Sequence, residues 1–164
     1  MKKLPFIVFF LFSLIGRGQE THSVEELQKV FPTAVLKSSL VNEFTGSVLN
    51  VSEESITHVS AIYSNPSLVI EIEILEFSYS KGMFNEYLEK VKSTKNNKNV
   101  QGYTKQVKWD GKRGFVEVNE EEKYCSLILN WDKKYVLNIR INGQAGEEEL
   151  EAVYRSLDFS LWNE

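Results

Sequence analysis

Two glutamates have the spacing that a catalytic pair would need. Glu71 and Glu73 alternate with Ile70, Ile72 and Ile74, so a strand would carry both carboxylates on one side. Their Cα atoms would then lie roughly 6.6 Å apart, which overlaps the carboxylate separation of an inverting glycosidase. Alternate glutamates on a strand are also how one face of an antiparallel sheet meets water. We therefore expect a solvated face and keep a hydrolytic pair as the alternative.

Histidine chemistry would depend on His58. The other histidine, His22, lies close to the site where we expect an N-terminal signal peptide, described below, to be cleaved. A hydrolytic triad needs a nucleophile, a base and an orienting acid that converge in space. No Gly-x-Ser-x-Gly turn is present to expose a serine, so we expect His58 to be structural and keep a hydrolase that uses it as an alternative. Two distant histidines and one cysteine lack the ligand spacing of a zinc site. We expect no metal and no cofactor.

A basic stretch is the best candidate for a binding surface. From Lys90 to Arg113 the sequence has eight basic residues and one acidic residue, Asp110. Such a stretch suits an anionic glycan, a lipid head group or an acidic protein partner. Its alternative role is a solvated hairpin, whose lysines discourage edge-to-edge aggregation. The residues that we assign to binding are Lys98, Lys105, Lys108, Trp109, Lys112 and Arg113.

The single cysteine, Cys125, lies in a strand-like run from Tyr124 to Leu129. No intramolecular disulfide can form, so packing must stabilise the domain. A cysteine in such a run is usually a small buried hydrophobe, and we expect that role. Intermolecular pairing or a reactive thiol are the alternatives.

The first residues predict export. Lys2 and Lys3 precede an apolar run from Leu4 to Ile15, and small residues flank Arg17, which is the order of a secretory signal peptide. The apolar run is shorter than the roughly 20 residues that a membrane-spanning helix needs. We expect residues 1–18 to be a signal peptide and residues 19–164 to form one domain in the periplasm or outside the cell.

The net charge of the chain without its expected signal peptide limits the kinds of partner that it could bind. Without the leader's three basic residues, 16 of the 19 basic residues remain against 23 acidic ones, a net charge of −7. An acidic surface argues against general nucleic-acid binding, which depends on neutralising phosphates. The mature length suits one domain with its own core.

The elements that would position these side chains follow from periodicity and turns. Ser23 and Glu26 fit a capping box at the start of a helix over residues 24–31. Short links, including Asp110-Gly111, predict an antiparallel meander, because parallel neighbours need long crossovers. The expected fold is α+β: a mostly antiparallel sheet of about six strands with a C-terminal four-strand meander, packed by two or three helices. The strands are expected at 56–63, 68–77, 103–109, 112–118, 124–131 and 135–141, and further helices after Ser80 and from Glu147.

Five short segments carry a family resemblance. They are Ala61-Ile62-Tyr63, Gly102 to Lys105, Trp109 to Phe115, Leu137 to Gly143, and Leu157-Asp158-Phe159. In these segments the chain resembles small exported bacterial domains near the PsbP-like α+β fold. That resemblance implies a non-enzymatic binding or accessory role. The resemblance does not include residues 19–60, and no functional residue can be assigned from it.

Together these patterns favour an exported, non-enzymatic domain that binds an envelope component or a protein partner. The alternatives are a hydrolase that uses His58 or the pair Glu71 and Glu73, and a carrier of a small apolar ligand.

Overall fold

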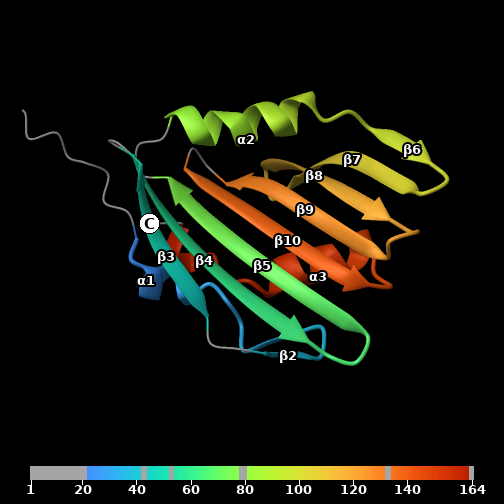
Figure 1. The fold of residues 1–164 in the computed structure, drawn as a ribbon, viewed down its shortest axis with the longest axis horizontal. Helices are drawn as coiled ribbons and strands as arrows, with labels where there is room; N and C mark the ends of the chain where they lie inside the picture. Colours follow the sequence, from blue (N-terminus) through green and yellow to red (C-terminus); the bar gives the residue numbers. More distant parts are fainter. Residues whose placement is uncertain (1–21, 42–43, 52–53, 78–80, 132–133, 163–164) are drawn as a thin grey trace, which may run out of the picture.

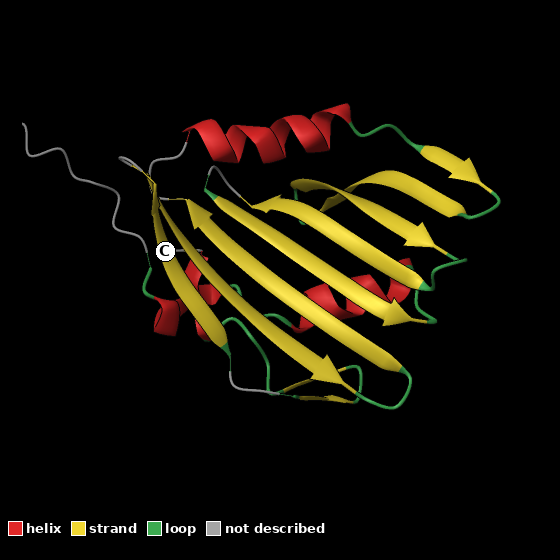
Figure 2. Cartoon of the chain, in the orientation of Figure 1, coloured by secondary structure: helices red, strands yellow, loops and turns green. Residues whose placement is uncertain are grey.

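The computed structural model describes residues 22–41, 44–51, 54–77, 81–131 and 134–162. Within these residues, ten strands form one antiparallel sheet and three helices pack on it (Figures 1 and 2). The predicted α+β class and the C-terminal meander are confirmed. The sheet is larger than expected, because four short or weakly patterned strands extend it at its two edges. The expected signal peptide, residues 1–18, lies outside the described residues.

The strands follow a simple spatial order, β1-β2-β4-β5-β10-β9-β8-β7-β6, with β3 beside β4 as well. In chain order they are β1 (Ala34–Val35), β2 (Ser38–Leu40), β3 (Thr45–Val51), β4 (Glu54–Ser64), β5 (Leu68–Phe77), β6 (Asn97–Asn99), β7 (Gly102–Trp109), β8 (Lys112–Asn119), β9 (Tyr124–Trp131) and β10 (Tyr135–Gly143). Strand β5 thus lies inside the sheet, paired with β4 on one side and with β10, far away in sequence, on the other.

The helices begin where side chains can satisfy their free N–H groups. Helix α1 (Val24–Gln28) has the predicted capping box: the Ser23 hydroxyl accepts from the Glu26 amide at 3.2 Å, and the Glu26 carboxylate accepts from the Ser23 amide at 2.8 Å. The helix ends at Gln28 instead of residue 31. Helix α2 (Lys81–Ser93) follows Ser80, which lies outside the described residues, and helix α3 (Glu147–Ser156) begins with three glutamates.

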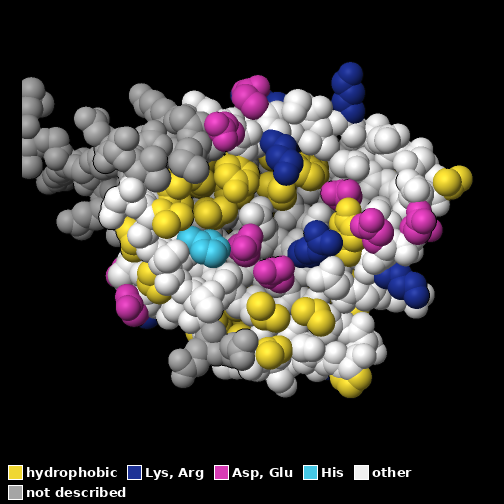
Figure 3. All heavy atoms as spheres, in the orientation of Figure 1, with side chains coloured by type: hydrophobic (Ala, Val, Ile, Leu, Met, Phe, Trp, Pro, Cys, Tyr) yellow, Lys and Arg dark blue, Asp and Glu magenta, His cyan; other side chains and the backbone are white. Residues whose placement is uncertain are grey.

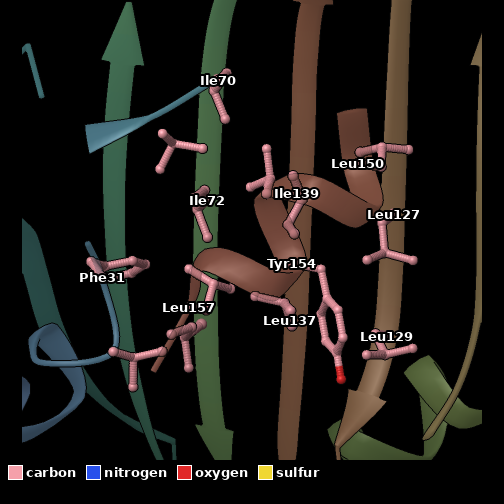
Figure 4. Packing of buried hydrophobic residues seen from close by; sticks show 14 of the residues in the cluster. Phe31, Ile70, Ile72, Leu127, Leu129, Leu137, Ile139, Leu150, Tyr154 and Leu157 are labelled. Carbon is pink, nitrogen blue, oxygen red and sulfur yellow. The ribbon is translucent and has the colours of Figure 1, made fainter. Parts of the chain in front are cut away.

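Alternation along the strands divides the apolar side chains between two layers. The larger layer lies between the sheet and helices α1 and α3, where strand residues such as Ile72, Leu137 and Leu129 meet Leu150 and Tyr154 of α3 (Figure 4). The smaller layer lies beneath α2 on the opposite face and consists of Ile56, Phe77, Phe84 and Val136, with partly buried neighbours. Because α2 covers only part of its face, the remainder of that face is open.

An aromatic cluster closes the C-terminal end of the larger layer. Trp131 stacks on Phe159 with centroids 4.1 Å apart, and Tyr135 stacks on Trp162 at 4.5 Å. Such pairs contribute about 0.5–1.5 kcal/mol each beyond the burial of their area. Tyr154 joins the cluster, and burial, followed by a hydrogen bond of 3.0 Å to Asp110, raises the pKa of its phenol.

The predicted Asp-Gly hairpin is confirmed by its backbone. Asp110 and Gly111 have φ angles of 47° and 82°, which is the positive-φ pair of a type I′ turn. This turn sets the register of β7 and β8, in which Lys108 lies opposite Arg113 and Trp109 lies opposite Lys112.

Candidate functional site

A polar groove lies on the open part of the sheet face that carries α2. Its volume is about 300 Å³, and Lys90 of α2 lies on its rim. Figure 3 shows acidic, basic and histidine side chains together on this face below α2, with apolar side chains on either side of them. The residues that line it are Glu71, Glu73, Lys90, Phe115, Glu117, Ser126, Leu127, Ile128, Asn138, Ile139 and Arg140.

Strand register sets the polar rows of the groove. In β5 the isoleucines at 70, 72 and 74 are buried on the α3 side, so Glu71 and Glu73 lie on the α2 side. Arg140 is directly opposite Glu71, and Asn138 is directly opposite Glu73. The pair Glu71 and Arg140 begins a row of side chains across the sheet. Ser126 of β9 lies opposite Arg140, and Glu117 of β8 lies opposite Ser126, so both continue this row. The groove therefore crosses four strands.

Arg140 is positioned by a tyrosine and an asparagine. Its guanidinium carbon lies 4.2 Å from the centroid of the Tyr124 ring, and its Nε donates to the Asn142 side chain at 3.1 Å. The Tyr124 hydroxyl donates to Glu117 at 2.8 Å, and this hydrogen bond, with burial, raises the pKa of Tyr124. Although Glu71 lies opposite Arg140, no ion pair joins the two side chains within the described part of the chain.

Glu73 and Asn138 form a second row beside the first, and two side chains approach the Glu73 carboxylate. The Asn138 amide donates to it at 3.3 Å, and His58 Nε2 lies 3.6 Å from its second oxygen. Burial first, and then the charge of Glu73, raises the pKa of Tyr87 on α2, so that phenol is near as well. The carbonyl oxygen of the Asn138 side chain is buried and accepts no hydrogen bond from any described residue. The groove is therefore rich in acceptors.

The residues of the hydrolase alternative come together on this face, but no nucleophile of the described part of the chain contacts the histidine. His58 contacts Glu73, whereas the nearby Ser60 hydroxyl shares a hydrogen bond of 2.6 Å with the Thr45 hydroxyl. Among the described residues, His58 makes no hydrogen bond to a serine, threonine or cysteine. The arrangement can hold a charged or polar ligand, while the contact that activates a nucleophile is missing.

The basic stretch singled out from sequence is divided between the two faces of the sheet. Lys105 and Lys112 lie on the α3 side, where Lys105 donates to Glu147 at 2.9 Å and Lys112 lies 4.8 Å from the Trp131 ring centroid. The hydrogen bond to Glu147 raises the pKa of Lys105. Trp109 is buried and packs on Tyr154. Lys98 is exposed on β6, while Lys108 and Arg113 are exposed together on the α2 side.

The exposed pair formed by Lys108 and Arg113 gives a stability prediction. Like charges directly opposite each other on neighbouring strands are destabilising. We expect Lys108→Glu to raise the free energy of unfolding by about 0.5 kcal/mol, because it replaces repulsion with attraction. Urea unfolding at low salt would measure the gain, which should shrink at high salt; a loss of stability at low salt would contradict it.

A buried charge cluster on the opposite face was missed by the sequence analysis. Glu76 is fully buried and accepts from Lys134 Nζ at 2.8 Å and from the His22 amide at 2.9 Å. His22 Nδ1 lies 3.2 Å from both Glu76 oxygens and 2.9 Å from the Tyr135 hydroxyl. The sequence did contain a signal for this burial. Glu76 continues the every-second-residue series of Ile70, Ile72 and Ile74, which are buried in β5. The cluster fastens residue 22 to β5.

Cys125 is fully buried, as expected for a structural cysteine. Burial, followed by the charge of Glu149, raises the pKa of its thiol to about 12. Because the thiolate is the reactive form, raising the pKa above the working pH suppresses reaction. We expect a disulfide reagent at pH 8 to label the folded protein at least about 100-fold more slowly than the urea-unfolded protein. Similar rates in the two states would contradict this prediction.

Two further observations bear on the class of protein. Among the described residues, no group of three His, Cys, Asp or Glu side chains is arranged to hold a metal ion. No helix in the same residues is long and apolar enough to span a membrane. Comparison with known proteins adds no family, since no protein-family model, curated protein or solved structure matches the chain significantly.

Proposed function

We propose that this protein is an exported, non-enzymatic binding domain, and that its ligand or partner segment occupies the α2-side groove. The observation that supports this most is the relation between Arg140 and Glu71, which lie opposite each other in register without an ion pair. Opposite charges across two strands ordinarily attract and pair. Charges that are held apart in a groove are available to the polar groups of a ligand.

A ligand screen tests this proposal. A compound that occupies the groove raises the unfolding midpoint of the protein, because binding stabilises the folded state by about 2.7 kcal/mol at a concentration 100 times Kd. Arg140→Gln should abolish the shift. Arg155→Gln is the matched control, since Arg155 is an exposed arginine outside the groove lining. Equal shifts in the wild type and in Arg140→Gln, or no shift with any compound class, would overturn the proposal.

The hydrolase is the second candidate, favoured by the approach of His58 to Glu73 at 3.6 Å. Its test is turnover of ester and glycan substrates by the purified protein. Loss of that turnover in His58→Ala or Glu73→Gln would establish the enzyme, and absence of turnover in the wild type would remove it. The polar lining of the groove gives no support to the third alternative, a carrier of an apolar ligand.

The partner proposed from sequence is an envelope component or a protein, in keeping with the resemblance to PsbP-like accessory domains. A second contact surface would consist of Lys108 and Arg113, which are exposed together on the α2 side of the β7–β8 hairpin and would meet an acidic partner. Reversing both to glutamate should weaken recovery of envelope material in pull-down without unfolding the domain. Lys105 and Lys112 are left unchanged, because they contact Glu147 and Trp131 on the other face. Unchanged recovery would count against this surface.

Export is proposed on the leader pattern alone. N-terminal sequencing of the protein recovered from cells should begin at Gln19, because the expected cleavage follows Gly18. Recovery of chains that still begin at Met1 would refute cleavage.

A further inference from the structure

We infer that the ligand of the groove is a small zwitterion, an amino acid or short peptide, whose carboxylate is bound by Arg140 and whose ammonium is bound by Glu71 and Glu73. This inference rests on the proposed binding function and specifies its ligand chemistry. It is carried by side chains of both charge signs that line one groove and leave hydrogen-bonding capacity unused.

Arg140 supplies the carboxylate end. Of its three guanidinium nitrogens, only Nε has a partner in the described part of the chain, namely Asn142. Contact with the Tyr124 ring fixes the plane of the guanidinium. A fixed guanidinium with both terminal nitrogens available is suited to bidentate binding of a carboxylate. Lys90 on the groove rim adds a second positive charge, with its Nζ 5.8 Å from the Phe115 ring centroid.

The glutamates of β5 supply the ammonium end. Glu71 is partly buried and has no hydrogen bond or ion pair with any other described residue. Next to it, Glu73 receives from the described residues only a long hydrogen bond from Asn138 and the approach of His58. An ammonium group offers three donors and a positive charge, which is the complement of these acceptors.

The mixture of charges excludes simpler ligands. A purely anionic ligand would meet the carboxylates of Glu71 and Glu73, whereas a purely cationic ligand would meet Arg140 and Lys90. A zwitterion satisfies both sets at once. The groove volume of about 300 Å³ is at the small end of the range for ligand pockets, which suits an amino acid or a dipeptide.

The test uses dialanine and its two blocked forms, measured by calorimetric or NMR titration of the full protein. N-acetyl-dialanine lacks the ammonium, and dialanine amide lacks the carboxylate. We expect each blocked form to bind about tenfold more weakly than dialanine, the size of effect that a lost charged hydrogen bond produces. Titration with free alanine separates a single amino acid from a peptide as the preferred ligand.

Two variants test which residue binds the carboxylate and which binds the ammonium of dialanine. Arg140→Gln should weaken dialanine about tenfold and abolish the difference between dialanine and its amide. Glu71→Gln should instead abolish the difference between dialanine and its acetylated form. The controls Arg155→Gln and Glu148→Gln change exposed residues outside the groove lining and should leave all affinities unchanged.

The outcomes separate this inference from the proposed function. Equal affinities of the three compounds, or no binding of dialanine, would overturn the zwitterion. If the screen then finds another ligand class whose binding Arg140→Gln abolishes, the groove remains the binding site and only the ligand chemistry is wrong. If Arg140→Gln affects no ligand, both are wrong.

Discussion

Replacing Lys134 with methionine is expected to lower the free energy of unfolding by about 3 kcal/mol. The Lys134 ammonium is the cation closest to Glu76, which is fully buried, and the two are 2.8 Å apart with Lys134 only 20 % exposed. Removing one partner of a buried ion pair is the costly case, because Glu76 would keep its contacts to His22 but lose its lysine. Urea unfolding followed by tryptophan fluorescence would measure the loss.

Two controls separate the effect of burial from that of the ion pair itself. Lys92 lies at the same distance of 2.8 Å from Glu89, but these side chains are 60 % and 70 % exposed. Lys92→Met should therefore change stability by no more than about 0.5 kcal/mol. The double variant Lys134→Met with Glu76→Gln should recover at least half of the loss, since Gln keeps an acceptor for the His22 amide without a charge. A double variant no more stable than Lys134→Met would contradict the explanation.

A second large effect is expected at Gly114, inside strand β8. A Cβ added there would lie 2.2 Å from the carbonyl oxygen of Ile128 and 2.9 Å from the Leu129 side chain on the neighbouring strand. The oxygen belongs to the backbone of β9 and cannot rotate away, so the two strands would have to separate. We expect Gly114→Ala to destabilise the protein by about 3 kcal/mol, at the upper end of overpacking costs.

Gly146 is the matched control for this substitution. It is the N-cap residue of α3, and an added Cβ would meet only the Glu149 carboxylate at 3.8 Å. Gly146→Ala should cost at most about 1 kcal/mol, as expected for an N-cap change. Equal shifts in the urea midpoint for the two variants would show that the contact with β9 is not the cause.

The parts of the fold that sequence predicted well are those whose signals are local. Strands β5 and β9 have the predicted bounds, because their alternation is strict and turns flank them. By contrast, residues 33–54 have weak alternation, and β3 exists because it pairs along β4 from Thr45 opposite Ser60 to Val51 opposite Glu54. Strand β6 has no apolar pattern, since its three residues are polar, and its pairing with β7 defines it.

Only part of the candidate site could be predicted from the sequence, for the same reason. Glu71 and Glu73 could be placed on one face of a strand from their spacing alone. That Arg140 lies opposite Glu71 follows from the pairing of β10 with β5, which joins segments far apart in sequence, and short-range patterns do not encode that register. The network that couples Arg140 to Tyr124 and Glu117 likewise depends on three different strands.

Tyr135 makes the two described ends of the chain neighbours: its ring lies 6.1 Å from that of His22 and 4.5 Å from that of Trp162, measured between centroids. This junction is on the α3 side of the sheet, whereas the groove opens on the α2 side. An affinity tag, fusion partner or solid support joined beside His22 or Trp162 would therefore leave from one corner of the molecule. Immobilised protein should keep the groove accessible, so surface-based binding assays suit this domain.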